Sequence, residues 1–353
     1  MNTAEIKLDP FSDRLLRWWD EHGRQDLPWQ QPRTPYRVWV SEIMLQQTQV
    51  ATVIPYFERW MKRFPDLRTL AEAPLDDVLA HWAGLGYYAR ARNLHRAAAQ
   101  CLEQHTGELP LNAEALSALP GIGLSTANAI ISQSTDRPAA VLDGNVRRSL
   151  ARHLALDGWT GKAAVQKTLW AEAEARLPEQ RGADYTQAIM DLGAMVCTRS
   201  NPDCPTCPVS RDCRAFNTGQ VHKYPTPRPA IKVTRKSFCM LIIRDGQGRV
   251  LLVKRPPSGI WGGLWSLPMG ETVGNIETEL GLSDIRTRPL ETINHRLSHI
   301  HMSIHAAMAT SIGASHVKCS SEQSWLDPAD HTSIGLPKPV SELLTRIKDG
   351  DIQ

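Results

Sequence analysis

The segment from Leu119 to Arg148 constrains the fold of this 353-residue chain more than any other stretch. Pro120, Gly121 and Gly123 interrupt a helical sequence, because proline lacks the amide that continues a helix and glycine tolerates a positive φ. Good helix formers stand on both sides, so the segment predicts a helix-hairpin-helix. The turn would present backbone amides at the start of the second helix, where they can bind a DNA phosphate. The alternative is a plain connection between two helices.

Two acidic residues stand in apolar surroundings. Asp143 follows the apolar run after the hairpin, where we expect its carboxylate to lie beside the bound phosphate. Glu42 follows Ser41 within the largely apolar stretch 38–44. Ser41 suggests the start of a helical turn, and the alternative is that residues 38–40 already belong to the helix. Burial would raise the pKa of Glu42, as a general acid near neutral pH requires. The alternative for Glu42 is a helix N-terminal residue that interacts only with the helix dipole.

Two further stretches suit contact with a duplex. Gln46 and Gln47 begin an uncharged polar run, and glutamine can both donate to and accept from base edges, although surface glutamines are common. In the stretch 84–92, Tyr87 offers a stacking or wedging face, and Arg90 and Arg92 are candidate phosphate partners. The alternative is that the tyrosines of this stretch pack between helices while the arginines face solvent.

Overall charge is weak evidence for DNA binding, since 40 Lys and Arg against 37 Asp and Glu leave a formal net charge of only +3. The N-terminus lacks a basic segment followed by an apolar one, and no run approaches about 18 apolar residues. The sequence therefore predicts neither secretion nor a membrane span. We expect a cytoplasmic protein associated with the bacterial nucleoid.

Four of the seven cysteines, Cys197, Cys204, Cys207 and Cys213, fall within one short segment. An odd total with one tight cluster favours a reducing compartment and a metal site. Zinc sites usually have two separated Cys-x2-Cys pairs, whereas this segment has one close pair. A single loop of unevenly spaced cysteines favours one 4Fe-4S cluster with a structural role, and zinc is the alternative.

The pattern of apolar residues changes from helical to mixed helix and strand after about two thirds of the chain. Residues 1–223 predict an all-α region, residues 224–234 a stiff proline-containing linker, and residues 235–353 an α+β domain. Strands are expected at 238–243 and 250–253, joined as a β-hairpin, and at 291–294 and 299–308. The stretch 262–280 has the outline of a Nudix domain. Only Glu277 and Glu279 could hold Mg²⁺ there, so we do not expect pyrophosphate hydrolysis. The helices expected in the first region are 11–22, 38–49, 52–63, 75–83, 89–105, 112–118, 125–134, 145–154, 162–176 and 182–196.

Taken together, these motifs closely resemble the MutY family of adenine DNA glycosylases. The resemblance implies a monomeric, multidomain protein with one 4Fe-4S cluster held by the four cysteines and a degenerate Nudix-like C-terminal domain. It also implies excision of adenine mispaired with 8-oxoguanine, and more weakly with guanine, in duplex DNA, as the first step of base excision repair. The motifs that carry the resemblance are the stretches 41–50, 84–90, 119–123 and 142–146 and the four-cysteine loop.

The resemblance also implies roles for single residues. Glu42 would protonate adenine at N7 and later assist the water, and Asp143 would stabilise the sugar cation at C1′ or form a transient adduct. Asn145 and Tyr87 would support Asp143. The remaining residues implied to contact DNA or the lesion are Gln46, Gln47, Tyr87, Gly121, Gly123, Ser125, Leu297, Ser298 and His299.

Two positions decide between related activities. Ser125 stands where the related endonuclease III and 8-oxoguanine glycosylases carry an attacking lysine, which predicts a monofunctional enzyme. Leu297 stands where the family has the phenylalanine of its Phe-Ser-His lesion-probing loop, so an aromatic contact is lost. The alternatives are an endonuclease III-like glycosylase for oxidised pyrimidines and a non-catalytic iron-sulfur DNA-binding protein.

Overall fold

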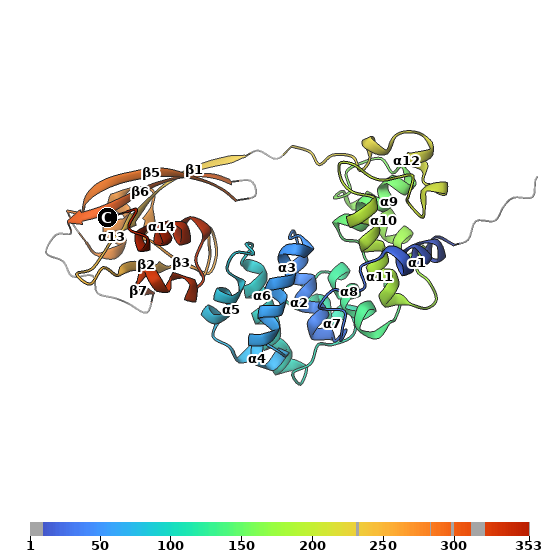
Figure 1. Cartoon of the computed structure of the whole chain (residues 1–353), viewed down its shortest axis with the longest axis horizontal. Coiled ribbons are helices and arrows are strands. Elements are labelled where there is room, and N and C mark those ends of the chain that lie inside the picture. The colour runs from blue at the N-terminus through green and yellow to red at the C-terminus, as the bar shows by residue number, and fades with distance from the viewer. Residues whose placement is uncertain (1–9, 231–232, 283, 298–299, 312–321, 353) are drawn as a thin grey trace, which may run out of the picture. The chain divides into compact units, whose positions relative to one another are not determined.

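The computed structural model describes residues 10–230, 233–282, 284–297, 300–311 and 322–352 (Figure 1). The chain divides into two compact units. One comprises Met1–Ala71 and Arg96–Pro229, and the other comprises Glu72–His95 and Ala230–Gln353. The predicted fold class is confirmed: the chain up to Val196 is helical, and an α+β domain with mixed sheets follows later. None of the helices in the described ranges is both long and apolar enough to cross a membrane.

The helical part agrees closely with the periodicity of the sequence, with one additional short helix, α4 (Leu67–Glu72). A π-helix, Leu192–Val196, continues the last long helix of this part toward the cysteines. The remaining helices before the cysteine loop are α1 (Phe11–His22), α2 (Pro35–Leu45), α3 (Val50–Arg63), α5 (Leu75–Trp82), α6 (Ala89–Gln104), α7 (Ala113–Ala118), α8 (Leu124–Thr135), α9 (Gly144–Leu154), α10 (Ala163–Ala175) and α11 (Gly182–Asp191).

Helix α2 corrects two local predictions. It begins at Pro35, and Thr34 is its N-cap, with the side chain accepting a hydrogen bond from the Arg37 amide at 3.3 Å. Of the two alternatives for Ser41, the one in which residues 38–40 already belong to the helix is correct: Ser41 is buried inside the helix, and its hydroxyl donates to the Val38 carbonyl. Gln46 is the C-cap, so the polar run that it begins lies in the turn before α3 rather than on a helix face.

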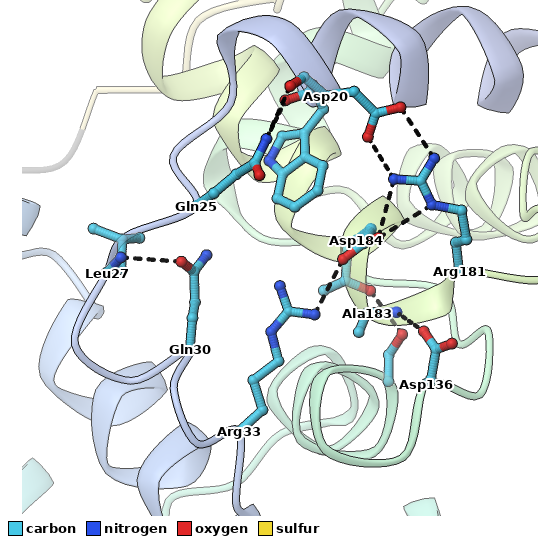
Figure 2. A network of polar contacts seen from close by, with 12 residues as sticks. Asp20, Gln25, Leu27, Gln30, Arg33, Asp136, Arg181, Ala183 and Asp184 are labelled. Atoms are coloured by element: carbon cyan, nitrogen blue, oxygen red, sulfur yellow. Dashed lines mark hydrogen bonds and ion pairs between the residues drawn. The ribbon is translucent and has the colours of Figure 1, made fainter.

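A polar network fixes the N-terminal helix of the first unit to α11 (Figure 2). The Arg181 guanidinium donates to both Asp20 on α1 and Asp184 on α11, and Arg33 donates to Asp184 from the other side. These ion pairs are partly exposed, so each contributes little free energy by itself, but their shared partners fix the geometry of the segment before α2. The same first unit holds a large apolar core around α1, α9 and α11.

The C-terminal part forms two sheets, of strand order β4-β1-β6-β5 and β3-β2-β7. β1 runs parallel to β6, which is antiparallel to β5, and these three strands lie side by side in Figure 1. The strands are β1 (Thr234–Ile242), β2 (Val250–Lys254), β3 (Trp265–Ser266), β4 (Met269–Gly270), β5 (Arg286–Leu297), β6 (Ile300–Ser311) and β7 (Gln323–Leu326). The helices of this part are α13 (Val273–Leu280), the 3-10 helix η4 (Pro328–Ser333) and α14 (Lys338–Lys348).

The predicted β-hairpin is only partly correct. The turn closes as expected, since the Asp245 amide donates to the Arg249 carbonyl and the Leu251 amide to the Ile243 carbonyl. The two strands nevertheless belong to different sheets, and a single bridge, between Arg244 and Val250, joins them beyond the turn. On α13, Glu277 accepts a hydrogen bond from the Ile285 amide at 2.8 Å, which gives this carboxylate a role in the fold.

The first residues of the predicted linker are bound to the helical unit. The Arg152 guanidinium donates to the Tyr224 carbonyl at 2.9 Å, and the Gly158 amide donates to the Thr226 hydroxyl at 3.0 Å. The first residues of the predicted linker are thus part of the first unit.

Candidate active site

Glu42 lies on α2 at the place where this helix packs against α8. The Gln133 side chain on α8 is buried, and its amide donates to Glu42 Oε1 at 3.0 Å. Burial of the carboxyl and the nearby charge of Asp143 raise the pKa of Glu42 from its ordinary value of 4.5 to about 7, although the hydrogen bond from Gln133 acts in the opposite direction. Glu42 can therefore carry a proton near neutral pH.

Asp143 is the N-cap of α9, and its Oδ1 accepts a hydrogen bond from the Val146 amide at 2.8 Å. Burial raises the pKa of Asp143, while the backbone hydrogen bonds and the positive charges of Arg147 and Arg148 oppose that rise. An N-cap position favours the ionised carboxylate, because the amides of the first helical turn point toward it. The side chain that caps the helix is thus also the second carboxylate of the site.

The structure brings the two predicted carboxyl groups together, close enough that the charge of Asp143 raises the pKa of Glu42. Their environments differ: Glu42 has one amide partner, whereas Asp143 has backbone donors and two arginines nearby. Two carboxyls in unequal environments can separate into one proton donor and one anion, which suits cleavage of a bond between a sugar and a base.

The hairpin before α8 has the predicted form. Gly121 has a φ of 80°, which favours glycine, and Gly123 is the N-cap of α8. Both glycines are exposed, and no heavy atom lies within 4 Å of the place where a Cβ on Gly123 would stand. This open turn leaves room for a phosphate beside the first amides of the helix.

Ser125 has a partner that the sequence does not reveal. Its hydroxyl accepts a hydrogen bond from the Leu142 amide at 2.9 Å, and Asn128, one turn later on α8, donates to the Ala140 carbonyl at 2.7 Å. Helix α8 therefore holds the extended segment that ends at Asp143. The hydroxyl fixes the position of the carboxylate through the backbone.

Arg148 connects the start of α9, next to Asp143, to the start of the cysteine loop. Its guanidinium donates to Asn145 Oδ1 at 2.9 Å, to the Gly193 carbonyl at 2.6 Å and to the Cys197 carbonyl at 2.8 Å. Sequence reasoning missed both Arg148 and Gln133. The three-residue spacing from Asn145 is the only signal for Arg148, and it indicates a shared helix face rather than a partner.

The four predicted cysteine ligands line one cavity below α9, together with Arg152, His153 and several apolar side chains. Arg152 Nη1 donates to Cys197 Sγ at 3.4 Å. Across the described ranges, no group of three or more ligand side chains converges on the site of a single metal ion.

Gln46 and Gln47, which are predicted duplex contacts, follow α2 in the first unit, where Gln47 has a φ of 60°. The predicted contact residues of the stretch 84–92 and Leu297 lie in the second unit. Tyr87 has a φ of 48° and a side chain that is 48% exposed. The two arginines predicted as phosphate partners are engaged elsewhere: Arg90 is buried, with a pKa lowered to about 10, and Arg92 donates to the Gly262 carbonyl. Leu297 ends β5 and pairs with Ile300. Ser298 and His299 lie outside the described residues.

Comparison with known proteins identifies the family. A model of the HhH-GPD superfamily of base excision DNA repair proteins matches residues 40–175, and a NUDIX domain model matches residues 239–346. The adenine DNA glycosylase of Buchnera aphidicola subsp. Baizongia pistaciae is 33% identical, over 96% of this chain and 97% of its own. This chain belongs to the adenine DNA glycosylase family. The human adenine DNA glycosylase is 39% identical, over 76% of this chain and 58% of its own.

Adenine DNA glycosylases are hydrolases that act on N-glycosyl bonds in base excision repair. Among solved structures, a thermostable thymine-DNA glycosylase matches with a TM-score of 0.52 and 25% identity, over 59% of this chain and 95% of its own. A non-covalent endonuclease III–DNA complex matches with a TM-score of 0.50 and 22% identity, which supports the helical fold alone.

Proposed function

We propose that this protein is a monofunctional glycosylase that excises adenine mispaired with 8-oxoguanine, and more weakly with guanine, from duplex DNA in the cytoplasm. The observation that carries the proposal is the pair of carboxyl groups, Glu42 and Asp143, held by α2 and by the start of α9. Membership of the adenine DNA glycosylase family supports the choice of base.

Glu42 acts as the general acid. Near pH 7 a substantial fraction of its carboxyl groups is protonated, so it can transfer the proton to adenine N7 and make the base a better leaving group. The electron pair of the breaking N-glycosyl bond leaves with the base, and positive charge develops on the sugar. Glu42, now ionised, then accepts a proton from the attacking water.

Asp143 stabilises that positive charge. Its carboxylate faces C1′ as the cation forms, and it holds the charge by electrostatic attraction or through a transient adduct. Asn145 and Tyr87 support it in this role. Arg148 holds the Asn145 amide, so the side chain that accompanies Asp143 has a fixed orientation. Ser125 accepts a hydrogen bond from the amide of Leu142, which precedes Asp143, and supplies no amine for a Schiff base, which supports the monofunctional assignment.

The duplex is held at several places. The exposed Gly121 and Gly123 of the hairpin bind a phosphate through backbone amides, beside Ser125. Gln46, Gln47 and Tyr87 contact the base pairs that are disturbed when adenine leaves the stack. In the C-terminal domain, Leu297, Ser298 and His299 probe the opposite base, so that Ser298 and His299 offer hydrogen bonds to 8-oxoguanine.

The four cysteines hold one 4Fe-4S cluster. Burial raises the pKa of the Cys207 thiol to about 12, so four thiolates at this cavity require a strongly positive group between them. When bound there, the cluster would crosslink the loop 197–213. Arg152 adds a donor to the Cys197 sulfur, which partly offsets the negative charge of the ligand set.

The test is adenine release under single-turnover conditions from duplexes with 8-oxoguanine, guanine or cytosine opposite adenine. We expect fast release opposite 8-oxoguanine, slower release opposite guanine and none opposite cytosine. Glu42→Gln should bind the 8-oxoguanine duplex and release no adenine, whereas Glu58→Gln, at an exposed position on α3, should behave like the unmodified protein. Full release by Glu42→Gln would exclude the general-acid role.

A further inference from the structure

The short helical stretch Glu72–His95 belongs to the same compact unit as the C-terminal domain. Polar contacts join the two parts. Lys254 Nζ on β2 lies 2.8 Å from both carboxylate oxygens of Asp76 on α5. The Tyr88 hydroxyl donates to the Leu336 carbonyl at 3.0 Å, and the Arg92 guanidinium donates to the Gly262 carbonyl. The C-terminal domain thus contacts α5 through the Lys254 side chain, and it contacts the end of the following turn and α6 through two backbone carbonyls.

Apolar packing closes the same interface. Leu79 on α5 is 1% exposed and lies against Gly335, where a Cβ would stand only 2.8 Å from Leu79 Cβ. Leu264, from the loop before β3, is fully buried beside this glycine. So close an approach of backbone to side chain requires glycine and holds α5 at a defined distance from the domain.

The turn between α5 and α6 is itself rigid. The Arg90 guanidinium lies over the rings of Trp82 and Tyr87, at 5.2 and 5.5 Å from their centroids. It donates to the carbonyls of Leu85 and Gly86, and Trp82 Nε1 donates to the Gly86 carbonyl at 3.0 Å. Tyr87 keeps a positive φ, which costs a residue with a Cβ about 1–2 kcal/mol. These contacts maintain an otherwise unfavourable backbone geometry.

The two tyrosines of this turn differ in exposure. Tyr87 displays an aromatic face to solvent, while its neighbour Tyr88 is half-buried. The Tyr88 hydroxyl accepts a hydrogen bond from the Gly84 amide at 3.4 Å and donates to Leu336, so it joins the start of the turn to the C-terminal domain.

We propose that the C-terminal domain positions Tyr87 for contact with the duplex, and that Tyr88 is the positioning residue that connects them. The Asp76–Lys254 ion pair and the Arg92 contact hold the two flanks of the turn in place. The domain therefore acts on the mismatch at two places, through its own lesion-probing residues and through the tyrosine that it holds. The inference rests on the proposed function, because it takes Tyr87 as a duplex contact.

The experiment is a double-mutant cycle on duplex binding. The dissociation constant for an adenine:8-oxoguanine duplex is measured in the Glu42→Gln background, where the adenine stays in place. Tyr88→Phe removes only the hydroxyl, and we expect binding about fivefold weaker, the size of one hydrogen bond. In protein that already carries Tyr87→Ala, Tyr88→Phe should have no further effect, because its influence passes through the missing ring. Tyr56→Phe, on α3, is the matched control.

A charge exchange provides a second readout. Asp76→Lys and Lys254→Asp should each weaken binding, and the two together should restore it. Equal weakening by Tyr88→Phe with and without the Tyr87 ring would overturn the inference, as would unchanged binding in Tyr88→Phe. If Tyr87→Ala alone binds the duplex normally, the proposed contact of Tyr87 fails and the inference fails with it.

Discussion

Glu42→Gln is expected to stabilise the protein in alkaline solution while removing its activity. In the folded protein the pKa of Glu42 rises from 4.5 to about 7, so the folded state holds this proton more tightly than the unfolded state does. Stability is therefore lost as pH rises between these two values. At about 1.36 kcal/mol per pH unit, the loss reaches about 3 kcal/mol once Glu42 is ionised. Glutamine cannot ionise, and its Oε1 can still accept the hydrogen bond from Gln133.

The assay compares the thermal unfolding midpoints of the two proteins at a series of pH values. The midpoints should nearly coincide near pH 4.5, and the variant should melt roughly 6–12 °C higher above pH 8, since about 1 kcal/mol shifts the midpoint by about 2–4 °C in a unit of this size. Glu58→Gln, at an exposed position, should show no such dependence. A difference that stays constant with pH, or that grows toward acid, would refute burial as the cause of the raised pKa.

Three further changes test the supports of the site. Arg148→Gln should slow adenine release at least tenfold and loosen the loop that begins at the first cysteine, so normal release together with normal visible absorbance would contradict its bridging role. Ser125→Ala leaves the Leu142 amide without its partner and should cost about 1–3 kcal/mol of stability with slower release; an unchanged melting midpoint would count against that hydrogen bond. Cys204→Ser should reduce iron content and visible absorbance, whereas Cys101→Ser, at a buried position outside the loop, should leave both unchanged; an equal loss in the two would point to general misfolding.

Features that depend on local chemistry could be predicted from the sequence. The hairpin at Gly121 and Gly123 follows from backbone freedom at glycine, whereas the role of Asp143 as the N-cap of α9 was not predicted. The predicted helix 38–49 began three residues too late, because Pro35 at the first helical position and Thr34 before it give the start signal of α2.

Features that depend on packing between distant segments could not be predicted. Gln133 is an ordinary polar residue until α8 lies against α2, and Arg148 is one of several arginines until the π-helix presents its carbonyls. The turn after β1 was predictable, but its strand pairs with β6, which is far away along the chain. Arg90 was predicted to be a phosphate partner because the sequence does not show that the fold of the turn buries its side chain.

The most direct test of the two-carboxylate site is the pH dependence of single-turnover adenine release from an adenine:8-oxoguanine duplex. Because Glu42 must be protonated, the rate should fall about tenfold per pH unit above a pKa near 7, and it should also fall in acid as Asp143 loses its charge. Glu58→Gln should give the same profile. The range from roughly pH 6 to pH 9 covers the titration of Glu42. A rate that stays constant over this range would contradict Glu42 as the proton donor.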